Sequence, residues 1–563
     1  MKKSLLFVAL GLTATAVFAQ NLSLDWAVQM GGTNTEIGYS ITTDDGGNVY
    51  ITGDFWGISD FDPGPETVNL TPSGISDIFI QKLDAEGNLM WVKKMGGIGR
   101  DVGYSIVSDA GGNVYTTGSF NDTVDFDPGI EVLNLISSYS DDVFIQKLDN
   151  DGNLLWVKQI GGIYNQFGFS ITTDAEENVY ITGSFLGTCD FDPGPETLLM
   201  TSFGAADIFV EKLDSDGNLL WVKQLGGDGI DQAFSIAVDN AGNVISTGYF
   251  FGIADFDPSP TEAMNLISSG QHDVFINSLD PNGNLLWARQ IGGDSGNRGL
   301  SVTTDISGNV YVSGDFRGTI DLDTDSGIIS LTSNGETDIF IQKFDFSGNF
   351  LWVRQMGGVG YESGNSITID TENNVYITGY FSDIVDFNPG AGTANLIAVG
   401  SNDIFIQKLD SEGNFIWVGQ MGGDSMNRGQ SITTDPSGNV YATGYFFGTV
   451  DFDPGSETVD ISSVGKEDIF VQKFKPVLVG INENSLFDKV IIYPNPTQGI
   501  VNINFGQLKD VSITITNIDG KVIHQKSQLN AGNYSFEIHV SKGLYFIEII
   551  SNEKRRVFKL NII

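Results

Sequence analysis

Pairs of aspartates separated by one apolar residue recur along this chain and are its best candidates for binding a cation. Residues i and i+2 of an extended segment point the same way, so each pair could offer two carboxylates that hold Ca²⁺ together with backbone carbonyls. The predicted metal-binding residues are Asp60 and Asp62, Asp125 and Asp127, Asp190 and Asp192, Asp255 and Asp257, Asp321, Asp323 and Asp325, and Asp451 and Asp453.

The same aspartates have a second interpretation. Most of the pairs belong to an Asp-Phe-Asp-Pro-Gly string, in which an Asp can cap a Pro-Gly turn while the Phe packs into a sheet. No copy supplies the bidentate Glu of a complete calcium-binding hand loop. Calcium therefore remains a possible cofactor beside a purely structural role.

Residues that would support other chemistry are scarce. The chain has three histidines, His272, His524 and His539, and a single cysteine, Cys189. A Ser-His-Asp triad needs a converging His, and zinc sites need several His or Cys ligands. The lone cysteine excludes an intramolecular disulfide and is expected to be a buried apolar residue. We predict no enzymatic activity, with a carboxylate-pair glycosidase as the alternative.

The elements that position these residues repeat. A Trp followed four residues later by Gly-Gly occurs seven times, at spacings of 65 or 66 residues. A fixed period of this kind indicates units that bury their apolar faces on their neighbours. The seven residues are Trp26, Trp91, Trp156, Trp221, Trp287, Trp352 and Trp417, and their expected role is packing between sheets.

Each repeat reads as four short strands. The runs are rich in Val, Ile, Tyr, Phe and Trp, no helical periodicity competes with them, and Asp-x-x-Gly-Asn turns join them in pairs. In the first repeat the expected strands are Ser40–Thr43, Asn48–Gly53, Asp77–Leu83 and Asn88–Met95.

The two ends of the repeat array complement each other. Leu22–Met30 reads as a fourth strand without a preceding third strand, and Asp468–Phe474 reads as a third strand without a following fourth. Placing the first beside the second closes a ring and removes its edges. We therefore predict an all-β fold with a seven-bladed β-propeller of four strands per blade over residues 20–475, closed by its N-terminal strand.

The long connections of such a propeller lie on one rim, because strand direction alternates. This rim carries the aspartate pairs and the segments after each Gly-Gly, which vary most between repeats. Recognition residues often lie on loops of this kind. Trp56, which lies off the repeat pattern, and Arg298 and Arg428 are the predicted binding residues.

Both ends of the chain carry export signals. Residues 1–19 combine a basic start, an apolar stretch and a small-residue cleavage site, which is typical of a signal peptide, and no other segment reads as a membrane span. Residues 20–482 hold 18 Lys and Arg against 64 Asp and Glu, a balance of −46. Such charge disfavours nucleic acid and anionic lipid as partners and suits cations or neutral sugars.

Two known families resemble parts of the chain. The string D-[IV]-F-[IV]-x-K-[LF]-D-x-x-G-N-L-x-W, with GNVYxTG upstream, resembles the bacterial β-propeller repeat of exported and surface proteins, the SBBP type, over about residues 22–475. That resemblance implies a propeller and surface display without a single activity.

The C-terminal segment, residues 490–563, resembles the type IX secretion C-terminal sorting domain. Its motif residues are Pro494, Asn495, Pro496, Gly499, Gly543 and Tyr545, before a basic tail. The resemblance implies passage through the outer membrane of a Gram-negative bacterium by the type IX secretion machinery. The alternating strands, such as Val511–Asn517 and Tyr534–His539, predict a small β-sandwich after a linker at 476–489.

These observations predict a secreted scaffold on the outer cell surface, acting in adhesion or binding with carbohydrate or a surface protein as its partner. The alternatives are a glycan-processing enzyme on the same scaffold and a purely structural surface protein.

Overall fold

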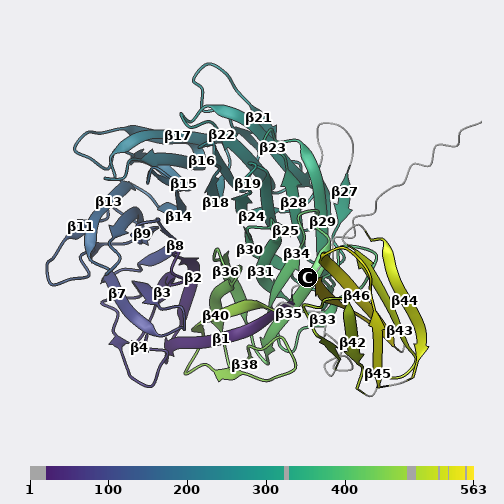
Figure 1. The fold of residues 1–563 in the computed structure, drawn as a ribbon. Helices are drawn as coiled ribbons and strands as arrows, with labels where there is room; N and C mark the ends of the chain where they lie inside the picture. The colour runs from purple at the N-terminus through teal and green to yellow at the C-terminus, as the bar shows by residue number, and fades with distance from the viewer. Residues whose placement is uncertain are drawn as a thin grey trace, which may run out of the picture. The chain divides into compact units, whose positions relative to one another are not determined.

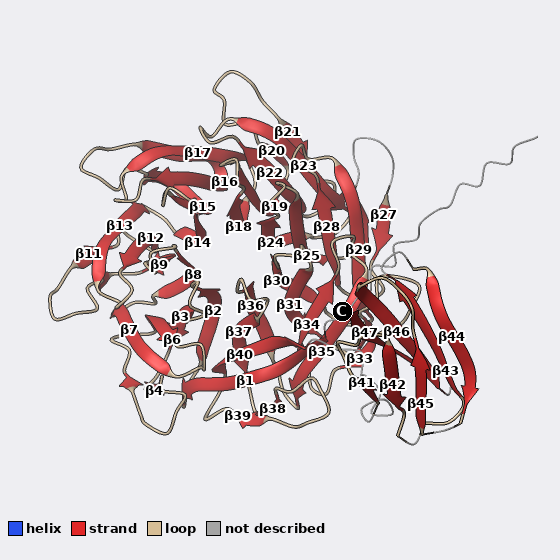
Figure 2. Cartoon of the chain, viewed as in Figure 1, coloured by secondary structure: helices blue, strands red, loops and turns tan. Residues whose placement is uncertain are grey.

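The structure is a computed structural model that describes residues 21–322, 329–477, 490–506, 508–517, 520–530, 532–551 and 554–563. These residues form strands and loops without a helix (Figure 2). They divide into two compact units, Asn21–Val477 and a C-terminal unit that includes residues 490–563. The expected signal peptide, most of the expected linker, Asp323 and Asp325 lie outside the described residues.

Each repeat of the larger unit folds into an antiparallel sheet of four main strands. In the first repeat these are β2 (Glu36–Thr43), β3 (Val49–Phe55), β6 (Asp77–Leu83) and β7 (Leu89–Gly97), paired in that order. Every residue of β3 and β6 is buried, as expected for strands covered on both faces.

The other repeats use the same order of strands. They are β8 (Val102–Ser108), β9 (Val114–Phe120), β12 (Asp142–Leu148) and β13 (Leu154–Gly162); β14 (Gln166–Thr173), β15 (Val179–Asp190), β16 (Leu199–Leu213) and β17 (Leu219–Gly227); β18 (Gln232–Val238), β19 (Val244–Phe250), β22 (Asp273–Leu279) and β23 (Leu285–Gly293); β24 (Arg298–Thr304), β25 (Val310–Phe316), β28 (Asp338–Phe344) and β29 (Phe350–Gly358); β30 (Ser363–Ile369), β31 (Val375–Phe381), β34 (Asp403–Leu409) and β35 (Phe415–Gly423); and β36 (Arg428–Thr434), β37 (Val440–Phe446) and β40 (Asp468–Val477).

The fourth strand of the last sheet comes from the beginning of the described chain. Strand β1 (Asn21–Gly32) runs antiparallel to β40, with pairs from Asn21–Val477 to Met30–Ile469. The first strands of all repeats gather around the centre of the unit in Figure 1, where β2 lies beside both β8 and β36. The sheets are therefore arranged in a propeller-like manner.

A serine side chain joins each first strand to its neighbour. The register of β2 against β3 shifts between Gly38 and Ser40, and Ser40 Oγ accepts the Ile106 N–H of β8 at 3.2 Å. The same bond occurs in every repeat, from the N–H of Ile41 to Ser431, Ile171 to Ser105, Ile236 to Ser170, Val302 to Ser235, Ile367 to Ser301 and Ile432 to Ser366.

The sequence predicts a plain loop between the second and third strands of a repeat, but the structure shows a more regular connection. It forms a short hairpin that extends the sheet of the preceding repeat: Asp60 in β4 (Ser59–Asp60) pairs with Gly31 of β1. A Cβ on Gly31 would collide with the Asp468 side chain, and one on Gly32 with the Ile58 carbonyl. This close approach explains why Gly-Gly recurs after each Trp.

The remaining short strands follow this pattern, with the hairpin of the third repeat continuous with β15 and β16. They are β5 (Asn69–Leu70), β10 (Thr123–Asp125), β11 (Asn134–Ile136), β20 (Ile253–Asp255), β21 (Asn265–Ile267), β26 (Thr319–Asp321), β27 (Ser330–Thr332), β32 (Ile384–Asp386), β33 (Asn395–Ile397), β38 (Thr449–Asp451) and β39 (Asp460–Ser462).

The repeated tryptophans pack between sheets. Trp26 in β1 donates its indole N–H to the Ala85 carbonyl at 3.1 Å, and its ring lies 6.4 Å from that of Tyr441. The corresponding bonds run from Trp91 to Asn150, Trp156 to Ser215, Trp221 to Pro281, Trp287 to Phe346 and Trp352 to Ser411. Each connects a fourth strand to a turn of the next repeat.

Buried acidic or amide side chains fix the connections that enter each first strand. Glu362 Oε2 accepts the Gly358 N–H at 2.9 Å, and Asp101 Oδ2 accepts the Gly97 N–H at 2.8 Å. The residues at this position, all fully buried, are Glu36, Asp101, Gln166, Asp231, Asn297, Glu362 and Asn427. Burial raises the pKa of Glu362 to about 8, and those of Glu36 and Asp101 to about 7.

The C-terminal unit is a sandwich of two sheets that share one apolar core, with Val501, Ile513 and Ile547 fully buried in it. Its strands are β41 (Ile491–Tyr493), β42 (Ile500–Asn504) and β45 (Asn533–Glu537) in one sheet, and β44 (Val522–Leu529), β43 (Val511–Asn517), β46 (Gly543–Ser551) and β47 (Lys554–Ile562) in the other.

The sorting motif ties the start of this unit to its last strand. Asn495 Nδ2 donates to the Lys559 carbonyl at 2.7 Å, and Asn495 Oδ1 accepts the Asn561 N–H at 2.9 Å. Pro494 and Pro496 flank this residue. Gly499 has a φ of 129°, Gly543 begins β46, and the buried Tyr545 donates its hydroxyl to the Ser541 carbonyl.

Deleting Leu22–Met30 should lower the melting temperature of the full chain and broaden its transition, because the deletion exposes the edge of β40 and removes the Trp26 contact. Circular dichroism with heating measures the effect. A melt identical to that of the intact chain would show that β1 does not stabilise the repeat unit.

Glu362→Gln should raise the melting temperature at pH 8 and change it little at pH 5. An acid whose folded pKa is raised binds more protons folded than unfolded, so its contribution to stability is lost as pH rises toward 8. Gln stays neutral and can still accept the Gly358 N–H. The reciprocal variant Gln166→Glu should lower the melting temperature mainly at pH 8. Equal shifts at both pH values would refute this explanation.

Candidate functional site

One variable residue precedes the serine on each first strand, and in four consecutive repeats it is aromatic. The ring centroids of Tyr39 and Tyr104 lie 5.6 Å apart, and those of Tyr104 and Phe169, and of Phe169 and Phe234, lie 5.4 Å apart. The series continues from Phe234 to Tyr249 at 5.6 Å. We call Tyr39, Tyr104, Phe169, Phe234 and Tyr249 the aromatic arc.

The remaining repeats have Leu300, Asn365 and Gln430 at this position, and two of these make polar contacts. Asn365 Nδ2 donates to the Gly429 carbonyl at 2.8 Å and to Gln430 Oε1 at 3.4 Å. Ser363, two residues before Asn365, donates its hydroxyl to Asp315 Oδ2 at 2.9 Å. We call Arg298, Asp315, Ser363, Asn365 and Gln430 the polar arc. The aromatic arc belongs to the first four repeats, and the polar arc belongs to the last three.

Arg298, one of the predicted binding residues, belongs to the polar arc. Its guanidinium makes two hydrogen bonds to the Asp315 carboxylate, at 2.5 and 3.1 Å, and its side chain is 42% exposed. Burial and the charge of Arg298 lower the pKa of His272, which keeps this imidazole neutral at neutral pH.

The other two predicted binding residues belong to other repeats than Arg298. Arg428 lies on β36 with its guanidinium 4.3 Å from the centre of the Tyr380 ring. Trp56 donates its indole N–H to Asp54 at 3.1 Å, and the Arg100 guanidinium lies 5.8 Å from its ring. Burial raises the pKa of Asp54 to about 6, although Arg100 and Trp56 oppose that shift.

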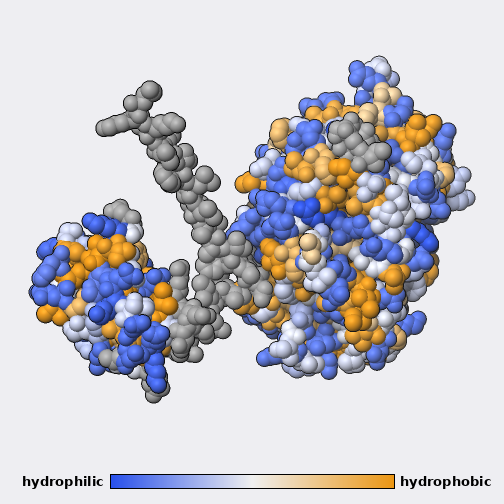
Figure 3. All heavy atoms as spheres, turned by 90° about the vertical axis from the view of Figure 1, so that its right-hand side faces the viewer, coloured by the Kyte–Doolittle hydropathy of each residue, from blue (hydrophilic) through white to orange (hydrophobic). Residues whose placement is uncertain are grey.

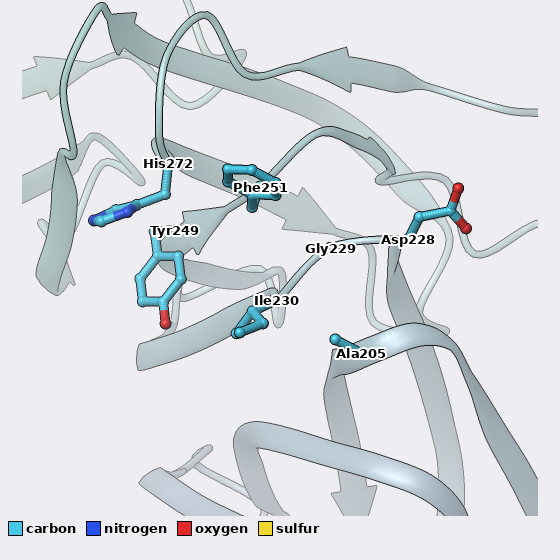
Figure 4. A pocket seen from close by; sticks show the side chains of 7 residues that line it. All are labelled: Ala205, Asp228, Gly229, Ile230, Tyr249, Phe251 and His272. Atoms are coloured by element: carbon cyan, nitrogen blue, oxygen red, sulfur yellow. The ribbon is translucent and has the colours of Figure 1, made fainter.

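A cavity of about 400 Å³ lies beside the end of the aromatic arc, between the third and fourth repeats. Its lining residues are Ala205, Asp228, Gly229, Ile230, Tyr249, Phe251 and His272 (Figure 4). The His272 ring lies 4.6 Å from that of Tyr249, and the Tyr249 hydroxyl donates to Gln232 Oε1 at 2.8 Å.

Sequence reasoning did not single out the aromatic arc or this cavity. The signal was present, since the residue before each serine changes from Tyr or Phe in the first four repeats to Leu, Asn and Gln in the last three. Apolar side chains elsewhere on the surface are spread among hydrophilic ones, as Figure 3 shows for one face. His272 was considered only as a catalytic residue, not as a partner of Tyr249.

The aspartate pairs bind their own backbone. Asp60 Oδ1 accepts the N–H groups of Asp62 and Val68 at 3.0 and 2.8 Å, and Asp62 Oδ1 accepts that of Gly64 at 2.7 Å. The intervening Phe61 is fully buried against Phe55 and Phe79. The pairs at 125 and 127, 190 and 192, 255 and 257, and 451 and 453 repeat this capping pattern.

These contacts fit the turn-capping role. Within the described ranges, no group of three or more His, Cys, Asp or Glu side chains is placed to hold a metal ion. A calcium ion at a pair would need the second carboxylate oxygens together with backbone carbonyls. Calcium binding at these pairs therefore stays a prediction.

Comparisons with known proteins identify both parts of the chain. A family model described as beta-propeller repeat matches residues 155–184 and 351–380, and one described as secretion system C-terminal sorting domain matches residues 491–563. The second match indicates export by type IX secretion to the cell surface or the extracellular space. No helix among the described residues is long and apolar enough to cross a membrane.

Two curated relatives are similar to part of the chain. An uncharacterized WD repeat-containing protein of Acanthamoeba polyphaga mimivirus is 25% identical over 441 residues, covering 67% of this chain and 32% of its own. The regulatory protein FlaEY of Caulobacter vibrioides is 24% identical over 209 residues, covering 35% of this chain and 21% of its own. The chain thus spans at most about a third of these relatives.

A solved structure from Bacteroides thetaiotaomicron VPI-5482, a structural genomics protein of unknown function, is 11% identical to this chain. It aligns over 81% of this chain and 98% of its own, with a TM-score of 0.29. The chain thus contains beta-propeller repeats, matched over residues 155–184 and 351–380, and carries a secretion system C-terminal sorting domain over residues 491–563.

Proposed function

We propose that this protein is an exported, seven-bladed β-propeller displayed on the outer surface of a Gram-negative bacterium, where it binds carbohydrate without transforming it. The observation that carries the proposal is the pair of arcs, aromatic on one side and polar on the other, on an otherwise constant frame. The sorting domain supplies the contact with the type IX secretion machinery.

Two features support a closed ring of seven blades. The serine-to-backbone bonds connect each repeat to the next and return from Ser431 to Ile41 in the first repeat. Strand β1 pairs with β40 on one edge and β4 on the other, so it joins residues from the last and first repeats. Radial repetition of four-stranded sheets leaves only short, protected edges and is the usual arrangement of such repeats.

The chemistry of the arcs supports carbohydrate as the ligand. A sugar ring has an apolar face of C–H groups and a polar edge of hydroxyls, so an aromatic surface beside amide and charged groups matches both. The acidic repeat region disfavours anionic polymers. A neutral oligosaccharide fits these conditions best.

Binding without catalysis is supported by the use of the rim carboxylates. Glu36, Asp101, Asp231 and Glu362 accept backbone N–H groups while fully buried. Asp77 accepts the Ser73 N–H at 2.8 Å and is likewise fully buried. Groups committed in this way hold loops and are poorly placed to reach a substrate.

The full chain should bind at least one neutral hexasaccharide from a panel of β-1,4-glucan, β-1,3-glucan and α-mannan, measured by titration calorimetry. Tyr104→Ala should weaken that binding by about tenfold, because it removes one ring of the aromatic arc. Tyr139→Ala, which removes a side chain that is 85% exposed and not part of either arc, is the matched control. Absence of binding across the panel, or hydrolysis of a bound sugar, would contradict the proposal.

Calcium at the aspartate pairs is a separate proposal with its own test. If the pairs hold Ca²⁺, a chelator should lower the melting temperature of the full chain, and added calcium should restore it. Melting temperatures that agree with calcium and with chelator would leave turn capping as the role of these residues.

A further inference from the structure

We propose that the cavity between the third and fourth repeats is the subsite that receives the terminal ring of a neutral oligosaccharide. This inference rests on the proposed carbohydrate-binding function and names the place that would determine its specificity. It is carried by the walls of the cavity, by His272 and by the position of the cavity at the end of the aromatic arc.

The walls are apolar and in part exposed. Phe251 and Ile230 are each about half exposed, at 50% and 49%, and in Figure 4 Phe251 lies above Ile230 and Ala205. Tyr249 is held through its hydroxyl by Gln232, which leaves its ring to form part of the wall. Partly exposed aromatic and aliphatic side chains around a hollow are typical of small-molecule sites.

The cavity has a neutral polar group on one side and no carboxylate aimed into it. His272 is kept neutral by burial and by Arg298, and a neutral imidazole offers one donor and one acceptor, which suits a sugar hydroxyl. The Asp228 carboxylate points away from the other lining side chains in Figure 4. These features favour an uncharged ligand over an anionic or cationic one.

The loops around the cavity are tightly packed, so its shape is set before a ligand arrives. A Cβ on Gly229 would collide with the Phe251 carbonyl, and one on Gly296 would collide with the His272 imidazole. The Asn297 N–H donates to the His272 carbonyl at 2.9 Å. A preformed site loses little conformational entropy on binding.

The combination of lining residues occurs at one junction between repeats. At the position of His272 the other repeats have Ser76, Asp141, Ala206, Thr337, Asn402 and Glu467. The seventh repeat is most alike, with Tyr445 and Phe447 in the places of Tyr249 and Phe251, but it has Glu467 instead of the histidine. A volume of about 400 Å³ is near the lower end for ligand pockets, which suits one or two sugar rings at a chain end.

The experiment compares cavity variants with equivalent variants elsewhere, using the same hexasaccharides and the full chain. Ala205→Phe fills the cavity and should weaken binding about tenfold or more, whereas Ser401→Phe, at the same position of the sixth repeat, should leave the affinity unchanged. Phe251→Ala should weaken binding by several-fold, and Phe447→Ala, its counterpart in the seventh repeat, should not.

The outcomes separate this inference from the proposed function. If no hexasaccharide binds the unmodified chain, the proposed function fails. If binding occurs and Tyr104→Ala weakens it while Ala205→Phe and Phe251→Ala do not, the inference alone fails. Melting temperatures check that each variant is folded. If Ala205→Phe does not fold, Phe251→Ala alone tests the cavity. This variant should fold, because the Phe251 side chain is half exposed.

Discussion

The arrangement of the repeat region depends on a hydrogen bond between a serine side chain and the backbone of the neighbouring first strand. Strands within a sheet pair through backbone hydrogen bonds. Here a serine side chain provides the polar contact between two neighbouring sheets. The first strand bulges beside this bond, between Gly38 and Ser40. The same bulge separates the serine from the residue before it, so the strand segment that makes the contact between sheets also presents the variable residue that contributes to the two arcs.

Much of this fold could be predicted from the sequence, and the reasons are physical. The alternation of β-branched and aromatic residues with Asp-x-x-Gly-Asn turns defines strands, and the unmatched run at Leu22–Met30 indicates the partner of Asp468–Phe474. The short hairpins at the aspartate pairs could not be found this way. Their strands are two or three residues long and pair with glycines of a different repeat, so no local periodicity marks them.

The candidate site was predictable only in part. Arg298 is predicted as a binding residue on the loop rim, but its pairing with Asp315 and its effect on His272 depend on β24, β25 and the segment before β22 coming together. The many acids of the rim read as possible ligands in sequence, yet burial and backbone N–H donors commit most of the repeated ones to holding loops. The role of a carboxylate here therefore depends on which N–H groups donate to it, and these contacts cannot be read from the sequence.

The short hairpins at the aspartate pairs restrict how repeats can be added to such a chain or removed from it. Four of the sheets take their four main strands from one repeat and two short strands from the repeat that follows, so the repeat of the sequence and the sheet of the fold do not coincide. An additional repeat would supply the two outer strands of the sheet before it. The sheet of the additional repeat would in turn take its two outer strands from the repeat that follows. Lengthening or shortening the array thus alters two sheets at a junction, because neighbouring repeats share the strands of one sheet.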